Sequence, residues 1–378
     1  MNFVPLHRSS VPQYLYLHYP VCKHVCSYCD FNVYASSKMA KGFNEIWLRA
    51  MELHLLNLVQ TDQHPLKTLY LGGGTPSLLE ISDLKNLLKI LKTRFEFSRD
   101  LEFTMETNPE NLNLEYLRAL KNEIGVNRLS LGVQSFLPNQ LKRLERLATA
   151  KKLEQVIFEI QSEFKNFSLD WMIGIPDQTL ESFEEDLKKF IEISPPHLST
   201  YILTLPADHK MKTNLTMQKL LVSDEGVQNI YLKICDALRA SGYEHYEISN
   251  FSKPGFRSKH NSNYWNSSSD YLALGPGAHG YLKNESERIR YENIRDPLVW
   301  SSSDFGFENS EILTAEQQKL ENFYLRLRTR QPVFVSEVNE SVISPMLQEK
   351  WIKLEGNEMF LTESGWLLME SIAEKLLP

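Results

Sequence analysis

Three cysteines, Cys22, Cys26 and Cys29, lie close together near the start of the chain. The segment before them, 14–18, is apolar and aromatic and predicts a strand, so the thiols are expected on the loop that leaves it. A compact loop of thiolates suits a four-iron cluster, whose irons normally take one cysteine each. Because only three thiolates are offered, one iron would stay open to another ligand. The spacing therefore predicts an iron–sulfur centre that carries out chemistry.

Two other uses of these thiols have to be weighed. With His18 or His24 they could complete a Cys3His zinc site, although structural zinc motifs usually place a second ligand pair well downstream, and none is evident here. Disulfides are less expected, because the chain has four cysteines, no apolar leader and no apolar run of membrane length, which is typical of a cytoplasmic protein. The fourth thiol, Cys235, falls in a predicted helix, Asp224–Ala240, and is expected to be buried.

The composition is that of an ordinary globular protein and predicts a sizeable core. The 378 residues are 42% apolar and 24% charged, and this length allows two to three domains. The formal net charge is −7, so the chain supplies no basic face to neutralise phosphates. The charge therefore argues against a nucleic-acid partner.

Apolar runs alternate with amphipathic stretches in the first half of the chain. The expected strands are 14–18, 68–71, 101–106, 128–133, 168–173 and 198–203. The expected helices are 41–60, 82–95, 114–122, 151–163 and 180–193. Strands separated by helices imply βαβ units and a parallel sheet, which predicts a partial (β/α)6 barrel. Two flat nucleotide-binding halves are the alternative, but no Gly-x-Gly-x-x-Gly motif follows the first strand.

The chain is expected to divide into three parts. Residues 1–205 would form the partial barrel, residues 206–300 an extension of it, and residues 301–378 a small α+β domain of winged-helix type. The expected elements of that last domain are a helix over 314–330, a turn at Gly356, a strand over 359–362 and a helix from Gly365. Winged helices often bind DNA, but this acidic chain favours a lid or docking module instead.

Polar residues and glycines follow or end five of the expected strands. They are the three cysteines after the first strand, Gly72–Gly74 and Thr75 after the second, Glu106 and Asn108 at the third, Gln134 and Ser135 at the fourth, and Asp170 in the fifth. Parallel sheets and barrels build their active sites at this carboxyl edge. The glycines would let the backbone approach a small polar ligand, and Glu106 suits ribose hydroxyls or an amine. A ligand site is therefore expected beside the thiols.

Several motifs in order resemble those of a known family. They are the Cys-x3-Cys-x2-Cys loop and the segments 72–76, 127–136, 169–170, 174–176 and 275–280. They resemble the radical S-adenosylmethionine superfamily, and within it the oxygen-independent coproporphyrinogen oxidases and their relatives, the HemW-type haem chaperones. The resemblance implies a [4Fe-4S] cluster on Cys22, Cys26 and Cys29, with S-adenosylmethionine chelated to the open iron.

The resemblance also implies which residues surround the cofactors. Tyr16, Gly73 and Glu106 match residues around the cluster-bound S-adenosylmethionine. The residues that match those around a second S-adenosylmethionine in the oxidase are Tyr28, Gly74, Thr75, Gln134, Arg146 and Asp170, with a weaker match at Ile202. Two segments near this second site, 143–148 and 205–208, depart from the chaperone pattern, which puts the second site in doubt.

Two positions indicate the chaperone branch. The oxidase carries a further cysteine two residues after the last ligand, where this chain has Phe31, and an aromatic side chain cannot replace a thiol in proton or radical chemistry. His260, Tyr264 and Trp265 belong to a His-Asn-x-x-Tyr-Trp motif that resembles one implicated in haem handling by the chaperones. Histidine is a common haem ligand and aromatic rings pack on porphyrins, although the same residues would also suit a packed core.

The resemblance implies a haem chaperone that binds haem as cargo and transfers it to apo-haemoproteins without converting a porphyrin. The alternative is an oxidase that removes two propionate carboxyls from coproporphyrinogen III. Haem and a recipient haemoprotein are the expected partners, any membrane contact would come through the recipient, and both a monomer and a dimer are open. His245 and His279 are weaker candidates for the haem ligand.

Overall fold

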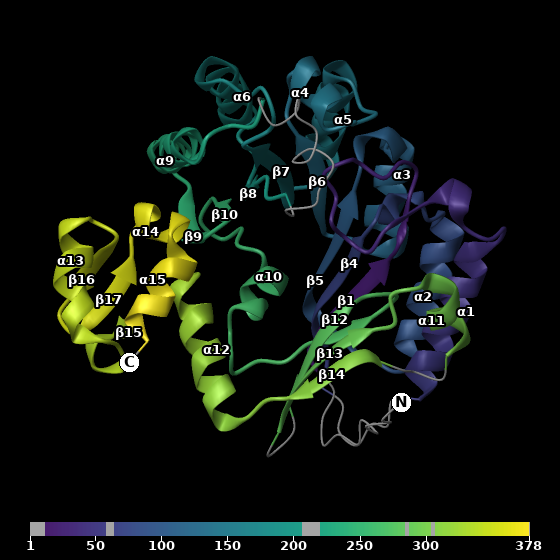
Figure 1. The fold of residues 1–378 in the computed structure, drawn as a ribbon. Coiled ribbons are helices and arrows are strands. Elements are labelled where there is room, and N and C mark those ends of the chain that lie inside the picture. The colour runs from purple at the N-terminus through teal and green to yellow at the C-terminus, as the bar shows by residue number, and fades with distance from the viewer. Residues whose placement is uncertain (1–11, 58–63, 206–219, 284–286, 304–306, 378) are drawn as a thin grey trace.

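The computed structural model describes residues 12–57, 64–205, 220–283, 287–303 and 307–377. Its main feature is a nine-stranded sheet in the order β11-β1-β4-β5-β6-β7-β8-β10-β9 (Figure 1). The strands are β1 (Tyr14–Tyr19), β4 (Leu66–Gly73), β5 (Phe97–Thr107), β6 (Arg128–Gln134), β7 (Phe167–Ile173), β8 (His197–Ile202), β9 (Glu244–Glu247), β10 (Asn250–Ser252) and β11 (Leu272–Leu274). Neighbours from β11 to β8 are parallel, and β10 and β9 continue the edge as antiparallel strands. The predicted parallel α/β fold is confirmed.

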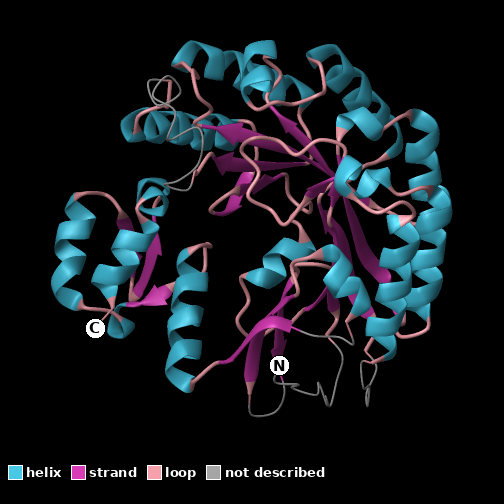
Figure 2. Ribbon diagram, turned by 45° about the vertical axis from the view of Figure 1, so that its right-hand side comes forward, coloured by secondary structure: helices cyan, strands magenta, loops and turns pink. Residues whose placement is uncertain are grey.

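Helices connect the parallel strands and cover the outer side of the curved sheet (Figure 2). They are α1 (Phe43–Leu56), α2 (Ile81–Lys92), α3 (Leu114–Ala119), α4 (Pro138–Arg143), α5 (Ala150–Glu163) and α6 (Leu180–Ile193). Side-chain caps fix where α5 and α6 begin, because Thr149 and Thr179 each accept a hydrogen bond from the first turn. No helix in the described ranges is both long and apolar enough to cross a bilayer.

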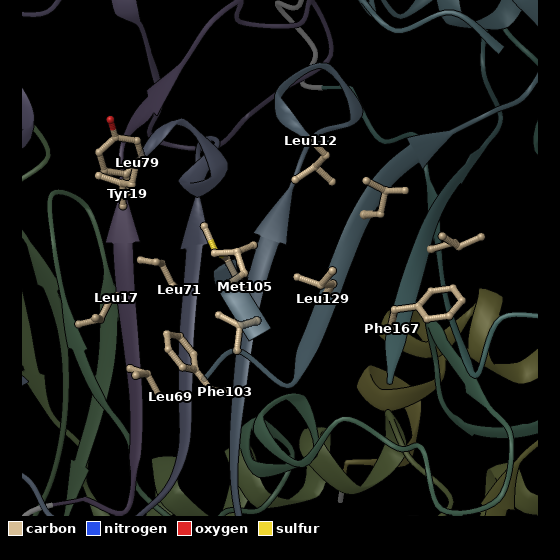
Figure 3. Packing of buried hydrophobic residues seen from close by; sticks show 14 of the residues in the cluster. Leu17, Tyr19, Leu69, Leu71, Leu79, Phe103, Met105, Leu112, Leu129 and Phe167 are labelled. Atoms are coloured by element: carbon tan, nitrogen blue, oxygen red, sulfur yellow. The ribbon is translucent and has the colours of Figure 1, made fainter. Parts of the chain in front are cut away.

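Side chains along the parallel strands alternate between two faces of the sheet, as the period of a strand requires. The apolar set, which includes Leu17, Leu71, Met105 and Leu129, belongs to one buried core with the helices (Figure 3). The intervening positions are largely polar, and they include Tyr16, His18, Tyr70, Thr104, Glu106, Arg128, Ser130, Ser168 and Asp170. Strands of a parallel sheet are usually apolar on both faces. The polar inner face therefore marks the side on which a ligand would bind.

The chain after residue 220 completes both edges of the sheet. Its elements up to residue 312, besides β9–β11, are α9 (Asp224–Ala240), α10 (Lys259–Tyr264), β12 (His279–Lys283), β13 (Arg288–Asn293), α11 (Pro297–Ser302) and β14 (Phe307–Ile312). β10 pairs with β8 at one edge and β11 pairs with β1 at the other, while β12, β13 and β14 form a separate antiparallel sheet. The proposed division at residue 205 stays a prediction.

A second buried core lies in the C-terminal part, where helices surround a small antiparallel sheet (Figure 1). Its elements are α12 (Ala315–Leu327), β15 (Val333–Phe334), α13 (Ile343–Gln348), β16 (Ile352–Glu355), β17 (Glu358–Leu361), α14 (Glu363–Leu367) and α15 (Met369–Leu376). The predicted turn at Gly356 joins β16 to β17, with a φ of +63° that glycine adopts without steric cost. Because β14 pairs with β13, it belongs with the preceding sheet, and the boundary at residue 301 stays a prediction.

One carboxylate links the C-terminal core to the main one. Glu363 accepts hydrogen bonds from Arg239 of α9 at 2.7 Å and from Arg330 at 2.6 Å. The guanidinium of Arg330 lies 4.2 Å from the centre of the Trp366 ring, and its Nε donates to the backbone carbonyl of His245 at 3.1 Å. Polar and aromatic contacts therefore fix the C-terminal unit against α9 and β9.

Candidate cluster and ligand site

The three cysteines lie on the loop that leaves β1. Cys22 ends the short strand β2 (Val21–Cys22), which pairs with β3 (Tyr34–Ala35) and closes the base of the loop. Cys22 is buried, Cys26 and Cys29 are partly exposed, and the amide of Cys29 donates to the carbonyl of Cys26 at 3.1 Å. Burial raises the pKa of Cys22 to about 11 and also raises the pKa of Cys29, so both thiols are protonated at neutral pH. Metal loading would therefore release protons.

A chain of hydrogen bonds connects two of the thiols. The Thr75 hydroxyl donates to Cys22 Sγ at 3.4 Å, and Asn108 Nδ2 donates to Thr75 Oγ1 at 2.9 Å. Arg146 continues the chain, with Nη2 donating to Asn108 Oδ1 at 2.8 Å and Nη1 lying 3.9 Å from Cys26 Sγ. Side chains that follow three different strands thus hold a buried cation beside Cys26, where it would offset the charge of thiolates.

The glycines at 72–74 allow β4 to pack closely against its neighbours. A Cβ on Gly72 would lie 2.9 Å from Glu106 Cδ, and a Cβ on Gly74 would lie 2.6 Å from the backbone oxygen of Val21. Gly73 has a φ of +108°, a conformation that residues with a side chain rarely adopt. The sequence led us to expect that the glycines admit a ligand. The structure shows that they first admit Glu106 and the cysteine loop.

Glu106, at the end of β5, is held between Tyr70 and Gly73. Its Oε1 accepts a hydrogen bond from the Tyr70 hydroxyl at 2.8 Å, and its Oε2 accepts one from the amide of Gly73 at 2.9 Å. Burial raises the pKa of Glu106 to about 7, against the lowering effect of these two hydrogen bonds. The carboxyl is therefore balanced between its neutral and anionic forms, and an ammonium ligand would favour the anion.

Tyr16, Gly73 and Glu106 line one cavity of about 580 Å³. This volume lies within the range of about 300–1,000 Å³ that is usual for small-molecule sites. Other walls come from the cysteine loop and from the chain between α10 and α11, and they include Phe31, Tyr264, Trp265, Tyr271, His279 and Arg295. The fold thus brings the predicted cofactor residues and the aromatic part of the predicted haem motif to a common cavity.

The residues matched to a second S-adenosylmethionine lie elsewhere; among the described residues none of them lines this cavity. Thr75 and Arg146 border a separate hollow of about 20 Å³ beside Cys26. Tyr28 packs against a small buried cluster of Leu144, Met172 and Ile175. The hollow next to Cys26 is too small for a cofactor of that size in the described conformation.

Three further residues of the second set do not line the large cavity either. Gln134 has a φ of +67°, which is uncommon for a residue with a side chain. Asp170 accepts a hydrogen bond from the Ser130 hydroxyl at 3.0 Å, and Ile202 borders another cavity, of about 560 Å³. Of the divergent segment 205–208, only Leu205 lies within the described residues. A second S-adenosylmethionine site stays a prediction.

His260 lies in α10 against the inner face of the sheet and is only 1% exposed. Its Nδ1 is 2.6 Å from Thr68 Oγ1, its Nε2 is 2.8 Å from the Tyr264 hydroxyl, and its ring stacks on Tyr70. Burial lowers the pKa of His260 to about 3, so the imidazole is neutral. Both ring nitrogens are engaged within the protein, whereas Tyr264 and Trp265 reach the cavity. A role of His260 as haem ligand stays a prediction.

The two weaker histidine candidates have contrasting surroundings. The His245 ring stacks on Phe251 with a centroid distance of 3.9 Å, and its Nδ1 lies 3.7 Å from Cys235 Sγ. Cys235 is buried, as expected. His279 begins β12, exposes 63% of its side chain and lines the cavity. Only the second of these histidines therefore borders the space that the cofactor residues share.

Sequence reasoning missed the residue that closes the cysteine loop. Asn32 Nδ2 donates to the backbone carbonyls of Pro276 at 3.0 Å and Arg295 at 2.9 Å, and the carbonyl oxygen of Asn32 lies 3.0 Å from His18 Nε2. A Cβ on Gly277 would lie 2.5 Å from Asn32 Nδ2. Gly277 is thus explained by the close approach of Asn32, whereas a Cβ on Gly275 would meet the backbone of His18 and one on Gly280 the ring of Tyr291.

The cysteine loop fits a [4Fe-4S] cluster. The three thiols are free, lie on one loop and have a buried guanidinium beside Cys26. Within the described ranges, no group of three or more His, Cys, Asp or Glu side chains is arranged to hold a single metal ion. This arrangement is compatible with a cluster, because each cysteine of a cluster binds a different iron. Asp30 and Phe31, which follow Cys29, line the cavity, so the loop lies beside the proposed ligand site.

Comparison with known proteins agrees with these features. The Radical SAM superfamily pattern matches residues 16–190. Heme chaperone HemW of Lactococcus lactis is 32% identical over 387 residues, covering 97% of each chain. Heme chaperone HemW of Escherichia coli K12 is 34% identical over 389 residues, covering 97% of this chain and 98% of the relative.

A solved structure shares the whole architecture. Coproporphyrinogen III oxidase (HemN) from Escherichia coli aligns with a TM-score of 0.80 at 20% identity, covering 97% of this chain and 89% of that one. At this identity the likeness establishes the fold, while the higher identity of the full-length HemW relatives establishes the family. The chain belongs to the HemW family within the radical S-adenosylmethionine superfamily.

Proposed function

We propose that this protein is a haem chaperone, which binds haem as cargo and transfers it to apo-haemoproteins. The observation that carries the proposal is the shared cavity, which Tyr16, Gly73 and Glu106 line together with Tyr264 and Trp265. A haem bound there would contact aromatic walls next to the cofactor residues. Membership of a family whose members are named heme chaperones supports this reading.

Resident cofactors would lie beside the same cavity. Cys22, Cys26 and Cys29 would hold a [4Fe-4S] cluster, and Glu106 would accept the ammonium group of S-adenosylmethionine. When bound, this pair supplies one-electron chemistry. The chain itself contributes the carboxylate of Glu106, which a cationic ligand keeps ionised, and the guanidinium of Arg146, which balances thiolate charge.

The cavity walls suit a large planar ligand. The rings of Tyr264 and Tyr271 meet edge to face with a centroid distance of 4.7 Å, and the Arg328 guanidinium lies 5.8 Å from the centre of the Trp265 ring. Such aromatic groups offer apolar faces to a porphyrin. Phe31, with 70% of its surface exposed, adds an apolar side chain on the cysteine-loop side.

Anaerobic reconstitution tests the proposal. The cluster-loaded protein is titrated with ferric haem and then mixed with apomyoglobin, and absorbance follows both haem binding and the appearance of holomyoglobin. We expect stoichiometric binding followed by transfer that is faster than release of haem into buffer. Absence of either step would refute the chaperone function. A Cys26→Ser variant with a lowered iron content shows which step depends on the cluster.

The same preparation tests the oxidase alternative. Coproporphyrinogen III is added under reducing conditions, and protoporphyrinogen formation and S-adenosylmethionine consumption are measured. We expect neither, because Phe31 stands where the oxidase carries a further cysteine. Product formation with consumption of S-adenosylmethionine would replace the chaperone assignment by an enzymatic one.

A further inference from the structure

We propose that His279, and not His260, supplies the imidazole that binds haem iron in this cavity. The inference rests on the proposed haem-binding function and identifies the contact by which that site would hold its cargo. A histidine can bind iron only through a ring nitrogen whose lone pair is available.

Two other histidines of the described ranges, His18 and His260, lie at or beside the cavity, and both ring nitrogens of each are engaged. His18 Nδ1 lies 3.0 Å from the Tyr16 hydroxyl, and His18 Nε2 lies 3.0 Å from the carbonyl oxygen of Asn32. His260 is held in the same way between Thr68 and Tyr264. To bind iron, either ring would have to give up a buried hydrogen bond and leave its partner unsatisfied, which is unfavourable.

Within the described ranges, the ring of His279 is not held by hydrogen bonds of this kind. Its side chain is exposed within the cavity wall, and its Nε2 lies 3.6 Å from Glu292 Oε1, which is beyond hydrogen-bonding distance. The structure shows no hydrogen bond to its ring from any of the described residues. A rotation of the ring would bring one nitrogen to Glu292 and turn the other toward the cavity.

Glu292 is placed to orient the ring of His279. The two residues face each other across the β12–β13 pair, so their side chains lie on the same face of that sheet. Glu292 is largely buried and lines the cavity, and it accepts hydrogen bonds from Arg295 Nε and from Asn309 Nδ2. Histidines that bind metals usually donate their second N–H to such a carboxylate, which raises the basicity of the ligating nitrogen. The iron would receive the lone pair of one nitrogen while the other keeps its proton toward Glu292.

The surroundings of His279 provide the other contacts that haem requires. Arg295, with 63% of its side chain exposed, lines the cavity and offers a cation to a propionate carboxylate. Trp265 and Phe31 contribute apolar surface to the same cavity. An axial ligand with its carboxylate, apolar walls and a cation thus occur together around one space of about 580 Å³.

Haem titration of single variants tests the inference. Wild type, His279→Ala, His260→Gln and His64→Ala are compared by absorbance and by electron paramagnetic resonance of ferric haem, which report imidazole ligation directly. His64 is an exposed histidine just before the amino end of β4, remote from the carboxyl edge, and controls for nonspecific binding. We expect His279→Ala to lose the imidazole signature and at least about tenfold in affinity, and the other two variants to keep both. Free imidazole should restore the signature in His279→Gly.

The possible results separate the two proposals. If the wild type binds no haem, the chaperone function fails and the ligand assignment fails with it. If the wild type binds haem and His279→Ala keeps its spectrum and affinity, only the ligand assignment fails. If His260→Gln loses the signature of imidazole ligation while its circular dichroism stays that of the wild type, the assignment of His279 is also overturned, in favour of His260.

Discussion

The amide of Gly73 donates a hydrogen bond to Oε2 of Glu106 at 2.9 Å and so joins the ends of β4 and β5. The same contact holds the carboxyl in a position where burial raises its pKa to about 7. A small change in its surroundings therefore decides whether Glu106 is neutral or anionic. Two predictions follow from that balance.

Binding of S-adenosylmethionine should strengthen as the pH rises through about 7, because only ionised Glu106 attracts the ammonium group. Glu106→Gln should weaken binding by about tenfold or more, since a hydrogen bond to a charged group contributes about 1.5–3 kcal/mol, and should flatten the pH dependence. Equilibrium dialysis with the cluster-loaded protein measures both. Glu96→Gln, an exposed change before the amino end of β5, is the control. Equal affinities at low and high pH in the wild type would contradict this role.

Protein stability should respond to Glu106→Gln in a pH-dependent way. The folded-state pKa lies above the unfolded one, so the folded protein binds the proton more tightly and loses stability as the pH rises from about 4.5 to about 7. Gln cannot ionise, so the free energy of unfolding of the variant should rise by about 3 kcal/mol relative to that of the wild type over this interval. Urea unfolding of both proteins at several pH values measures the difference between their free energies of unfolding. The contributions of the other titrating groups are the same in both proteins and cancel in this difference. A constant difference would show that Glu106 does not carry the shifted pKa.

Gly74→Ala should displace the cysteine loop. The new Cβ would lie 2.6 Å from the backbone oxygen of Val21, and backbone cannot move aside as a flexible side chain can. We expect the free energy of unfolding to fall by about 1–3 kcal/mol and the iron and sulfide content after reconstitution to be lower. Gly125→Ala is a matched control, because its site is open and only its φ of +85° is strained. Gly125→Ala should lower the free energy of unfolding by about 1 kcal/mol and leave the iron content unchanged.

Arg146→Met should lower the reduction potential of the cluster. The buried guanidinium lies 3.9 Å from Cys26 Sγ, and removing a positive charge there disfavours the added electron. A loss of about 1 kcal/mol of electrostatic stabilisation corresponds to about 40 mV for one electron. A redox titration followed by electron paramagnetic resonance measures it. Arg143→Met serves as control, because Arg143 pairs with Asp177 at a partly exposed position. Equal potentials in the two variants would exclude a specific effect of Arg146.

Glu363→Gln should loosen the C-terminal unit. Burial alone would raise the pKa of Glu363. The hydrogen bond from Arg330 and the charges of Arg330 and Arg239 instead hold this pKa at about 2. Ionised Glu363 therefore stabilises the folded protein above about pH 4.5, and this stabilisation is lost as the pH falls toward 2. We expect the variant to lose about 1–3 kcal/mol at neutral pH and to exchange amide hydrogens faster in α14 and α15.

The matched control for that change is Glu370→Gln. Glu370 pairs with Arg328 at 2.9 Å, but 70% of its side chain is exposed, against 22% for Glu363. An exposed pair contributes at most about 1 kcal/mol, so this variant should behave nearly as wild type. If both variants exchange equally fast, the less exposed position of Glu363 has no special importance.

Much of the main sheet could be predicted because its signals are local. The alternation of apolar and polar residues in β1, β4 and β5 marks strands, and polar residues at their carboxyl ends mark the site edge. The candidate role of Glu106 came from this strand-end pattern, and that of the cysteines from their spacing and their place after a strand. The C-terminal hairpin followed equally from the turn residues at Gly356.

Other features depend on contacts between distant parts of the chain and left little trace in the sequence. Nothing near His260 indicates that both of its nitrogens are engaged, nor near His279 that it stays exposed. The contacts of Asn32 join positions that are 244 and 263 residues apart. Such pairings follow from how the sheet edges close, which no local pattern encodes.

The reach of Asn32 also has a consequence for the order of events during synthesis. Its side chain binds carbonyls of Pro276 and Arg295, so these two hydrogen bonds cannot form until those residues have left the ribosome. The three thiols precede both of these residues by more than half of the chain. Iron bound before Arg295 is made would therefore lie in a loop that still lacks both of these hydrogen bonds.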